Sequence, residues 1–467
     1  MLNVVFKPHR THLKADTADV QKVFAMLQLI PKPEVAQARP PLALALVIDT
    51  SGSMQEYADQ QRAQEEIQKQ GMQGQQQATG DGSYQAFDLS LETKLDQAIA
   101  AAHALIDDIR LSPGDQVTVI HFDDEAKPLL RLTPLANKHA AHQAIESLRQ
   151  CSGGTHMAKG MHCAQQELRS LSPQVAKRAL LLTDGQTFDE PACRPLAGQF
   201  AEANTPLIAI GIGAEYNEAL LRDLAAVSQG RPYHLQTMTQ LHEILTMEVG
   251  SSVHEVVTDV QATVSVVKGV TLDSLTRVYT SLSEVPLAHP PYRLGNIVRD
   301  EYTVFVLEFT VAGIARPASR ARLAQVGLTG HVPGLGRRDE LPPRDLFVTF
   351  TTDEAATTAI DQEVMGYVQQ KNMDRMVQEA MQQATGDPGR ARQTLQVAMG
   401  MTQRIGNAAM TLMLHNALDE LNKTGTLSVH TRKTVALGGR TKTVKAGSTM
   451  PLDGGLSQEE IRTLTGA

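Results

Sequence analysis

The stretch LALALVIDTSGSMQEY, from Leu42 to Tyr57, decides the fold. It begins as a run of aliphatic residues and changes abruptly to Asp49, Ser51 and Ser53. A short, continuous apolar run is typical of a strand that is buried on both faces. The change therefore places small, oxygen-bearing side chains where a buried strand leaves the core.

The composition limits the classes of protein to consider. The 467 residues are 42% hydrophobic and 20% charged, which predicts two or three globular domains. A net charge of -8 argues against a general nucleic-acid binder, because no overall excess of positive charge would neutralise phosphates. Cys151, Cys163 and Cys193 have no CxxC spacing, which favours a reducing compartment over a disulfide scaffold. No apolar stretch reaches the ~18 to 20 residues of a spanning helix, so we expect a cytoplasmic protein that binds no membrane.

Between residues 41 and 250, aliphatic runs alternate with amphipathic helices. Three more such runs are QVTVIHF (Gln116 to Phe122), RALLLTD (Arg178 to Asp184) and PLIAIGIG (Pro206 to Gly213). The segments between them repeat apolar residues at intervals of three and four, as KLDQAIAAAHALIDDIR does. Continuous apolar strands separated by helices indicate a parallel sheet with both faces covered. We therefore predict a doubly wound, Rossmann-like α/β domain.

A polar segment interrupts this alternation between Gln55 and Ser90. It is rich in glutamine, poor in branched aliphatics, and contains Gly-Asp-Gly, which breaks regular structure. Its first half, QEYADQQRAQEEIQKQ, has good helix propensity. A surface insertion that buries little and a lid beside the Asp49 loop are both compatible with this composition.

The segment 251–352 is β-rich, and stretches such as EYTVFVLEFTV alternate apolar and polar residues between turns. This pattern predicts an antiparallel β-sandwich. Residues 1–40 contain two further strand-like segments, NVVFKPHR and VQKVFAMLQLIP. We predict that they pair with the later sandwich, so that the α/β domain is inserted into a β domain.

The C-terminal part divides into a helical region and a tail. Residues 353–424 show helical periodicity with a break at GDPG, which predicts a small bundle whose core is filled by methionines between Met365 and Met413. Residues 425–467 are rich in glycine and threonine and have few large hydrophobic side chains. We predict that they form a flexible, disordered tail.

Three loops of the α/β domain are predicted to bring oxygen atoms to one edge of the sheet. Asp49, Ser51 and Ser53 follow the first strand, Thr155 follows two glycines in CSGGTHM, and Asp184 ends the strand RALLLTD. Ligands of open parallel sheets bind at the carboxyl ends of strands, near the switch point. Hydroxyls with few carboxylates and room for water suit Mg²⁺ or Mn²⁺. The five residues therefore predict a divalent metal site.

In these residues the sequence resembles the von Willebrand factor type A family. The resemblance rests on DTSGS at Asp49–Ser53, the Thr155 loop and TDG at Thr183–Gly185, and it covers about Leu42–Leu245. It implies a metal-ion-dependent adhesion site, in which hydroxyls bind the metal directly, aspartates act partly through water, and an acidic residue of a protein partner completes the coordination. The insertion of residues 55–90 departs from the usual pattern and bears on ligand access. With its additional β and helical segments, the chain is expected to be a bacterial, cytoplasmic member.

Two alternatives bear on the Asp49 loop itself. In isolation, DTSGS fits a capped turn between a strand and a helix about as well as a metal loop, and Thr155 and Asp184 decide in favour of metal. A Mg²⁺-dependent phosphohydrolase would also place an aspartate after a strand. It would require a second carboxylate nearby, and Ser51 stands at that position, which disfavours it.

Two further groups of residues near these loops have simpler explanations. His156, His162 and Cys163 could suggest zinc, but no second pair of ligands accompanies them, so local packing or surface exposure is favoured. Asp123–Glu125 follow the strand QVTVIHF and fit a solvated turn, with a supporting role around the metal as the alternative.

The predicted tail has a basic, partly repeated sequence. RKTVALGG is echoed by TKTVKAGS, so Thr434 and Thr443 share a Lys-Thr-Val context. Five basic residues and no acidic one lie between Gly425 and Pro451: Arg432, Lys433, Arg440, Lys442 and Lys445. A solubilising basic tail and a kinase-recognised segment phosphorylated at both threonines are the two interpretations.

We therefore expect a non-enzymatic, metal-dependent protein-protein interaction module, in which Mg²⁺ or Mn²⁺ captures an acidic residue of a partner. The resemblance also permits a Ser/Thr kinase with a phosphothreonine-binding domain, or an AAA ATPase, as partners. The alternative function is an AAA-ATPase-associated subunit that inserts or matures a metal in a client enzyme.

Overall fold

The computed structural model describes the chain except residues 36–38, 71–74, 80–81, 87–88, 236–239, 314, 442 and 447–467. It divides into two compact units. One is an α/β unit, Pro40–Val253. The other, the β-helical unit, combines Met1–Arg39 with the described residues that follow Val253.

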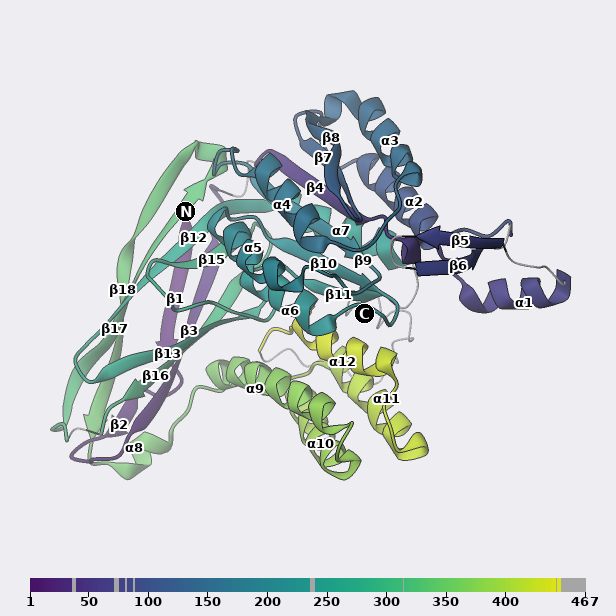
Figure 1. Cartoon of the computed structure of the whole chain (residues 1–467). Helices are drawn as coiled ribbons and strands as arrows, with labels where there is room; N and C mark the ends of the chain where they lie inside the picture. The colour runs from purple at the N-terminus through teal and green to yellow at the C-terminus, as the bar shows by residue number, and fades with distance from the viewer. Residues whose placement is uncertain are drawn as a thin grey trace. The chain divides into compact units, whose positions relative to one another are not determined.

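The α/β unit is built on a sheet of six strands in the order β11-β10-β9-β4-β7-β8 (Figure 1). Strands β4, β7, β9, β10 and β11 run parallel, and the edge strand β8 is antiparallel to β7. Their bounds are β4 Leu42–Asp49, β7 Gln116–Phe122, β8 Ala126–Pro134, β9 Ala176–Thr183, β10 Leu207–Ile212 and β11 Pro232–Leu235. The sequence does not predict β8 or β11, because β8 lies half exposed at an edge and β11 is only four residues long.

Helices cover both faces of this sheet. Leu44, Leu46 and Ile48 of β4 pack into one core, whereas Ala45 and Val47 pack into another. The first core includes residues of α2 (Lys94–Ile106), α3 (Lys138–Ser147) and α7 (Leu241–Val253), and the second those of α4 (Met157–Leu168), α5 (Glu190–Glu202) and α6 (Glu218–Val227). The doubly wound α/β prediction is confirmed. Because β4 is buried on both sides, its sequence reads as a continuous apolar run.

The insertion after β4 is closed at its base by backbone pairing. Ala58 N donates to Glu92 O at 3.0 Å, and Lys94 N donates to Glu56 O at 2.9 Å. Beyond this base lie α1 (Gln60–Gln70) and a hairpin of β5 (Gln75–Thr79) and β6 (Gly82–Ala86). Helix α1 falls in the half with good helix propensity, and the hairpin is not predicted by the sequence. The chain thus returns to α2 close to the point where it left.

Two five-stranded sheets form the β part of the other unit. Their orders are β1-β3-β16-β13-β14 and β15-β12-β17-β18-β2. The N-terminal strand β3 pairs antiparallel with the late strand β16, so the α/β unit is inserted into a β domain. The bounds are β1 Leu2–Pro8, β2 His12–Lys14, β3 Gln21–Pro31, β12 Glu255–Val266, β13 Val270–Tyr279, β14 Ser283–Glu284, β15 Tyr292–Val298, β16 Thr303–Val311, β17 Ser319–Val332 and β18 Arg337–Thr351.

The helices of the β-helical unit follow β18. They are α8 Glu354–Thr358, α9 Gln362–Gln383, α10 Pro388–Arg404, α11 Ala408–Thr424 and α12 Val429–Thr441 (Figure 1). Val304 and Val306 of β16 point away from the sandwich core and pack against Val364 and Tyr367 of α9. The bundle is therefore continuous with the outer face of the first sheet. Four of its methionines are buried, as expected for core filler: Met373, Met381, Met410 and Met413.

The prediction of a disordered tail from residue 425 is wrong for the segment that forms α12. This helix buries Val435, Ala436 and Leu437, and small residues beside them allow close packing. A side chain at Gly439, for example, would contact Met410 Cε at 3.6 Å. The helix has few large hydrophobic residues, but its small residues allow the neighbouring helices to pack closely against it, and this close packing stabilises it. Residues 447–467 lie outside the described residues.

The two threonines of the repeated motif lie in or next to this helix. Thr434 is a half-buried residue of α12. Thr443 follows the helix, and its hydroxyl oxygen is buried. Within the described part of the chain, no helix combines the length and the apolar character that a membrane span requires.

Candidate functional site

The candidate site lies where β4 ends, between β7 and β9. Strand β4 pairs with β7 on one side and with β9 on the other, so the strand order changes direction at β4. This edge is therefore the switch point of the sheet. The loop after β4, the loop before α4 and the loop after β9 meet here. The five residues predicted from the sequence come from these three loops.

Asp49 is fully buried and lies at the base of the site. Its Oδ1 accepts a hydrogen bond from Ser51 N at 2.9 Å, and its Oδ2 accepts one from Thr183 Oγ1 at 2.6 Å. Both bonds use groups within the loops themselves, so Asp49 fixes the loop after β4 against the end of β9. The short 3-10 helix Gly52–Gln55 begins directly after Ser51.

A chain of hydrogen bonds joins the serines to Asp184. Ser51 Oγ and Ser53 Oγ lie 3.2 Å apart, and Ser53 Oγ donates to Asp184 Oδ1 at 2.7 Å. Both aspartates are buried, with Asp184 2% exposed. The structure therefore brings together two carboxylates and two hydroxyls, although Ser53 and Asp184 are 131 residues apart in the chain.

Thr155 completes this group from the third loop. A side chain at Gly185 would contact both Ser53 Oγ and Thr155 Oγ1 at 3.6 Å, so the two hydroxyls face the same small space. The Thr155 loop is held to its neighbour because Gly52 N donates to Gly153 O at 3.0 Å. Glycine suits position 153, since an added Cβ would lie 3.0 Å from the backbone Asp124 N and 3.1 Å from Asp123 Cβ.

Lys94, the first residue of α2, is a member of the site that the sequence does not predict. Its Nζ donates to Asp184 Oδ2 at 2.7 Å, to Glu56 Oε2 at 2.9 Å and to Ser53 O at 3.3 Å. The side chain is only 14% exposed. A lysine at the first position of a helix is disfavoured by the helix dipole, and this is the signal that could have identified it.

The electrostatics of the site reflect the two adjacent buried carboxylates. Burial raises the pKa of Asp49, and the nearby charge of Asp184 raises this pKa further, against the lowering effect of the bonds from Ser51 and Thr183. Burial acts to lower the pKa of Lys94, but Asp184 and Glu56 outweigh it and the pKa of Lys94 is raised. The site thus carries more buried negative charge than Lys94 alone balances.

Comparisons with known proteins identify the domains. A family model described as von Willebrand factor type A domain matches residues 81–246, and one described as Sll0103-like, C-terminal alpha-helical domain matches residues 362–445. The solved structure of a von Willebrand factor type A protein from Catenulispora acidiphila superposes with a TM-score of 0.75, at 20% identity, over 95% of this chain and 98% of that one. The chain contains a von Willebrand factor type A (VWA) domain. The first match begins after Asp49–Ser53, so these residues are placed at the site by the structure.

Other relatives of this VWA protein are more distant or partial. The uncharacterized protein sll0103 of Synechocystis sp. is 27% identical over 46% of this chain and 52% of that protein. The uncharacterized protein YfbK of Escherichia coli is 25% identical over 32% of this chain and 27% of that protein. The chain thus matches about half, or less, of the length of these relatives. The ArnB paralog VWA2 of Sulfolobus acidocaldarius shares the fold, with a TM-score of 0.58 at 15% identity over 95% of this chain and all of that one.

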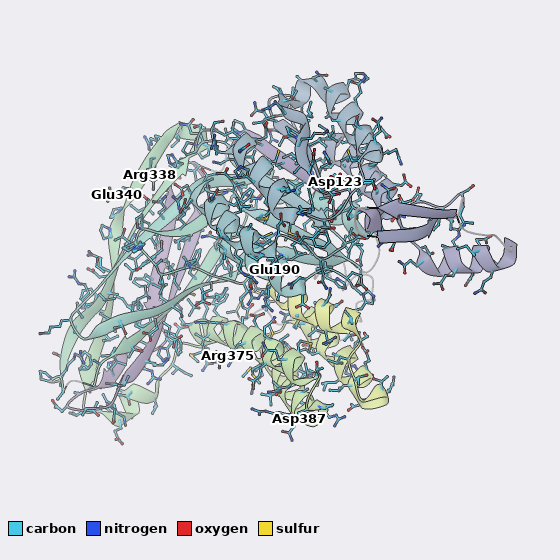
Figure 2. All side chains as sticks on the ribbon, in the orientation of Figure 1. Asp123, Glu190, Arg338, Glu340, Arg375 and Asp387 are labelled. Atoms are coloured by element: carbon cyan, nitrogen blue, oxygen red, sulfur yellow. The ribbon has the colours of Figure 1, made fainter. Side chains whose placement is uncertain are left out.

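Asp123, labelled in Figure 2, supports the site of the VWA domain from the loop after β7. The carboxylate is 6% exposed and accepts hydrogen bonds from Thr50 Oγ1 at 3.0 Å and from Glu125 N at 3.0 Å. It therefore braces the residue next to Asp49 rather than facing the hydroxyls. Asp124 is more than half exposed.

His156, His162 and Cys163 do not form a cluster. His156 Nδ1 lies 3.2 Å from Asp123 O, whereas His162 Nε2 lies 2.7 Å from Gln166 Nε2 on α4. Burial raises the pKa of the Cys163 thiol to about 11, so this cysteine is protonated at neutral pH. Among the described residues, no group of three or more histidine, cysteine or acidic side chains has the geometry of a metal site.

An aromatic side chain flanks the site. Phe188, in the loop between β9 and α5, is 67% exposed, and its ring lies 5.5 Å from that of His156. Its backbone N–H donates to Thr155 O at 3.0 Å, which fixes it beside the Thr155 loop. A large exposed apolar residue in this position offers contact area next to the polar site.

Proposed function

We propose that the VWA domain is a metal-dependent protein-interaction module, in which Mg²⁺ or Mn²⁺ binds at the loops after β4 and β9. Ser51, Ser53 and Thr155 would supply hydroxyl oxygens, and Asp49 and Asp184 the negative charge. The hydrogen-bonded chain from Ser51 through Ser53 to Asp184 carries this proposal. It shows hard oxygen donors gathered at one point, which is what these ions prefer.

The donor set also fits a cation on electrostatic grounds. Burying two carboxylates together is costly unless positive charge is supplied. Lys94 supplies part of that positive charge, since its ammonium contacts Asp184 Oδ2 and Ser53 O. A divalent ion would supply the rest and would bind an acidic residue of a protein partner at its remaining coordination position.

The contacts of the site residues fit a role in binding, and no catalysed reaction is needed to explain them. The Ser51 and Ser53 hydroxyls contact each other and Asp184, not a histidine that could act as a base. Both oxygens of Asp49 accept hydrogen bonds from the loops, so this carboxylate is held in place as a structural charge. The carboxylate within reach of Ser53 Oγ is that of Asp184, which is itself paired with Lys94 Nζ at 2.7 Å and so serves to hold charge at the site.

Direct measurement of Mn²⁺ binding tests the metal. Free Mn²⁺, counted by electron paramagnetic resonance, should fall on addition of the full-length protein. Asp49→Asn and Ser53→Ala should weaken binding on the order of 10- to 100-fold, as loss of groups around a metal does. Asp115→Asn is the matched control, because Asp115 is also buried but bonds to Leu42 N at the opposite end of β4. Equal Mn²⁺ affinity in all four proteins would overturn the proposal.

We also propose that a Ser/Thr kinase phosphorylates Thr434 and Thr443 and that a phosphothreonine-binding domain binds the product. The structure adds one requirement to this proposal. Because α12 is folded and the Thr443 hydroxyl is buried, a kinase would need the C-terminal end to open locally. Phosphosite mapping on protein from native cells tests it. Both threonines unmodified, in peptides that are well covered, would contradict it.

A further inference from the structure

Lys94 occupies a position that helix stability does not explain. It is the first residue of α2, directly after a capping box formed by Thr93 and Asp96. The partial positive charge of a helix N-terminus disfavours a cation there. The side chain is nevertheless 14% exposed and turned onto Asp184. Its place is therefore set by the candidate metal site and not by the helix that carries it.

The insertion determines how Lys94 reaches the site. Lys94 N donates to Glu56 O at 2.9 Å, so the entry and the exit of the insertion are joined at this residue. Glu56 Oε2 also accepts from Lys94 Nζ at 2.9 Å. The ammonium is thus held between Glu56, at the start of the insertion, and Asp184, in the loop after β9.

Lys94 and the serine hydroxyls share one carboxylate. Asp184 Oδ1 accepts from Ser53 Oγ, while Asp184 Oδ2 accepts from Lys94 Nζ at 2.7 Å. A divalent ion attracted by Asp184 would lie within a few ångströms of the ammonium. Like charges at that distance repel each other, and more strongly in a partly buried site than in bulk water. Lys94 should therefore oppose binding of the ion.

The same charge has the opposite effect on an anionic ligand. Two carboxylates, Asp49 and Asp184, and one ammonium, Lys94, together carry one net negative charge. Glu56 also pairs with Lys94, but its carboxylate is half exposed and screened by solvent, so it counts for less. A divalent ion changes this to one net positive charge, and one carboxylate of a ligand then neutralises the site. Without Lys94 the loaded site would already be neutral, and a carboxylate would add uncompensated negative charge.

We infer that Lys94 is an internal cation that weakens binding of the divalent ion and makes the loaded site select a carboxylate ligand. This inference rests on the proposed metal-dependent function and assigns within it the residue that sets ligand charge. The ion alone is then held loosely, and the ion with an acidic side chain is held firmly. Lys94 would thereby couple metal binding to partner binding.

Three variants of the full-length protein test this. Lys94→Met removes the charge but keeps a long side chain, and Lys94→Arg keeps the charge. Lys138→Met is the matched control, because Lys138 is also the first residue of a helix in this unit but pairs with the exposed Asp107 at 3.7 Å. Mn²⁺ affinity is read from free Mn²⁺ by electron paramagnetic resonance. Acetate binding to the Mn²⁺-loaded protein is read from water proton relaxation.

Lys94→Met should bind Mn²⁺ on the order of tenfold more tightly than wild type, and its Mn²⁺-loaded form should bind acetate at least roughly threefold more weakly. Lys94→Arg and Lys138→Met should resemble wild type in both measurements. If Lys94→Met is poorly folded without metal, restoration of its fold by Mn²⁺ at concentrations below the wild-type Kd supports the same conclusion.

The failures are distinguishable. Unchanged Mn²⁺ affinity in Lys94→Met, while Asp49→Asn abolishes binding, overturns the role of Lys94 and leaves the metal site standing. Tighter Mn²⁺ binding with unchanged acetate affinity overturns the selection of a carboxylate. No Mn²⁺ binding by wild type overturns the proposed function and the inference with it.

Discussion

Buried charge is arranged differently in the candidate site and in the C-terminal bundle. In the bundle, Asp374 of α9 is 4% exposed and pairs with Arg440 of α12, whose Nη2 donates to Asp374 Oδ2 at 3.1 Å. One buried negative charge thus meets one positive charge. At the site after β4, Lys94 pairs with Asp184, whereas the adjacent buried Asp49 accepts hydrogen bonds from two neutral groups, Ser51 N and Thr183 Oγ1.

The imbalance belongs to the site and not to the α/β unit as a whole. On α7, the buried Glu248 accepts hydrogen bonds from Arg231, which precedes β11, at 3.1 Å, and from Tyr233 of β11. A balanced pair has no need of a further ion, whereas an excess of buried negative charge attracts one. The comparison therefore separates balanced ion pairs, which stabilise the fold, from the excess negative charge that the proposed divalent ion would neutralise.

The largest expected effect is loss of the balanced pair. Arg440→Ala leaves Asp374 buried without its partner, which should destabilise the bundle by about 3 to 5 kcal/mol. Hydrogen exchange of the α9 and α12 amides during urea unfolding measures this in the bundle itself. The control Arg390→Ala removes an exposed pair with Glu379, at 3.7 Å, and should cost less than about 0.5 kcal/mol.

A double variant sharpens the same test. Replacing Asp374 by leucine and Arg440 by methionine removes both charges together, and should recover most of the lost stability. If Arg440→Ala is as stable as wild type, the ion pair does not stabilise the packing of α12, and the contrast with the candidate metal site fails.

The unbalanced site should make the free energy of unfolding decrease as pH rises. Burial and the charge of Asp184 raise the pKa of Asp49, so the unfolded chain releases this proton at a lower pH than the folded chain. Without divalent ions, the free energy of unfolding should then decrease as pH rises above about 4, the ordinary value for aspartate. Asp49→Asn should lack this decrease, and saturating Mn²⁺ should reduce it in wild type.

Urea unfolding at several pH values, with wild type and Asp49→Asn compared at each, isolates the contribution of this carboxylate from those of the histidines. Identical pH dependence in the two proteins, with metal removed by chelation, would show that Asp49 ionises at no cost in the folded state. The excess of negative charge would then be absent.

These contrasts show which features the sequence reveals. The strands β4, β7, β9 and β10 and the meeting of the five oxygen-bearing residues could be predicted, because a continuous apolar run ending in Asp49 determines both the sheet and its candidate binding edge. Lys94 was not predicted: its place at the start of a helix is a signal, but its approach to Asp184 depends on how a long insertion closes. Helix α12 was missed because Gly438 and Gly439 resemble linker residues until a neighbouring helix packs against them.

A smaller effect is expected from shortening the insertion. Replacing residues 64–86 by a short Gly-Ser linker keeps the pairing of Glu56 and Ala58 with the segment Glu92–Lys94. The stability of the α/β unit should change by less than about 1 kcal/mol, since loop length has a weak entropic effect. Mn²⁺ affinity should stay within twofold of wild type, measured as above. Loss of soluble protein would show that the removed segment packs against the unit.

Phe188→Ser should leave stability unchanged and affect only ligand choice. The ring is 67% exposed, so its removal costs little folding energy, but it lies beside the Thr155 loop, where a ligand bound to the metal could contact it. The Mn²⁺-loaded wild type should therefore bind 3-phenylpropionate roughly threefold or more tightly than acetate, because both carry one carboxylate and only the first carries an apolar ring. Phe188→Ser should lose this difference, whereas Ile109→Ser, which removes a 98% exposed side chain beyond the other end of α2, should keep it. Equal preference in all three proteins would show that the ligand approaches the metal from another side, and that negative charge alone selects it.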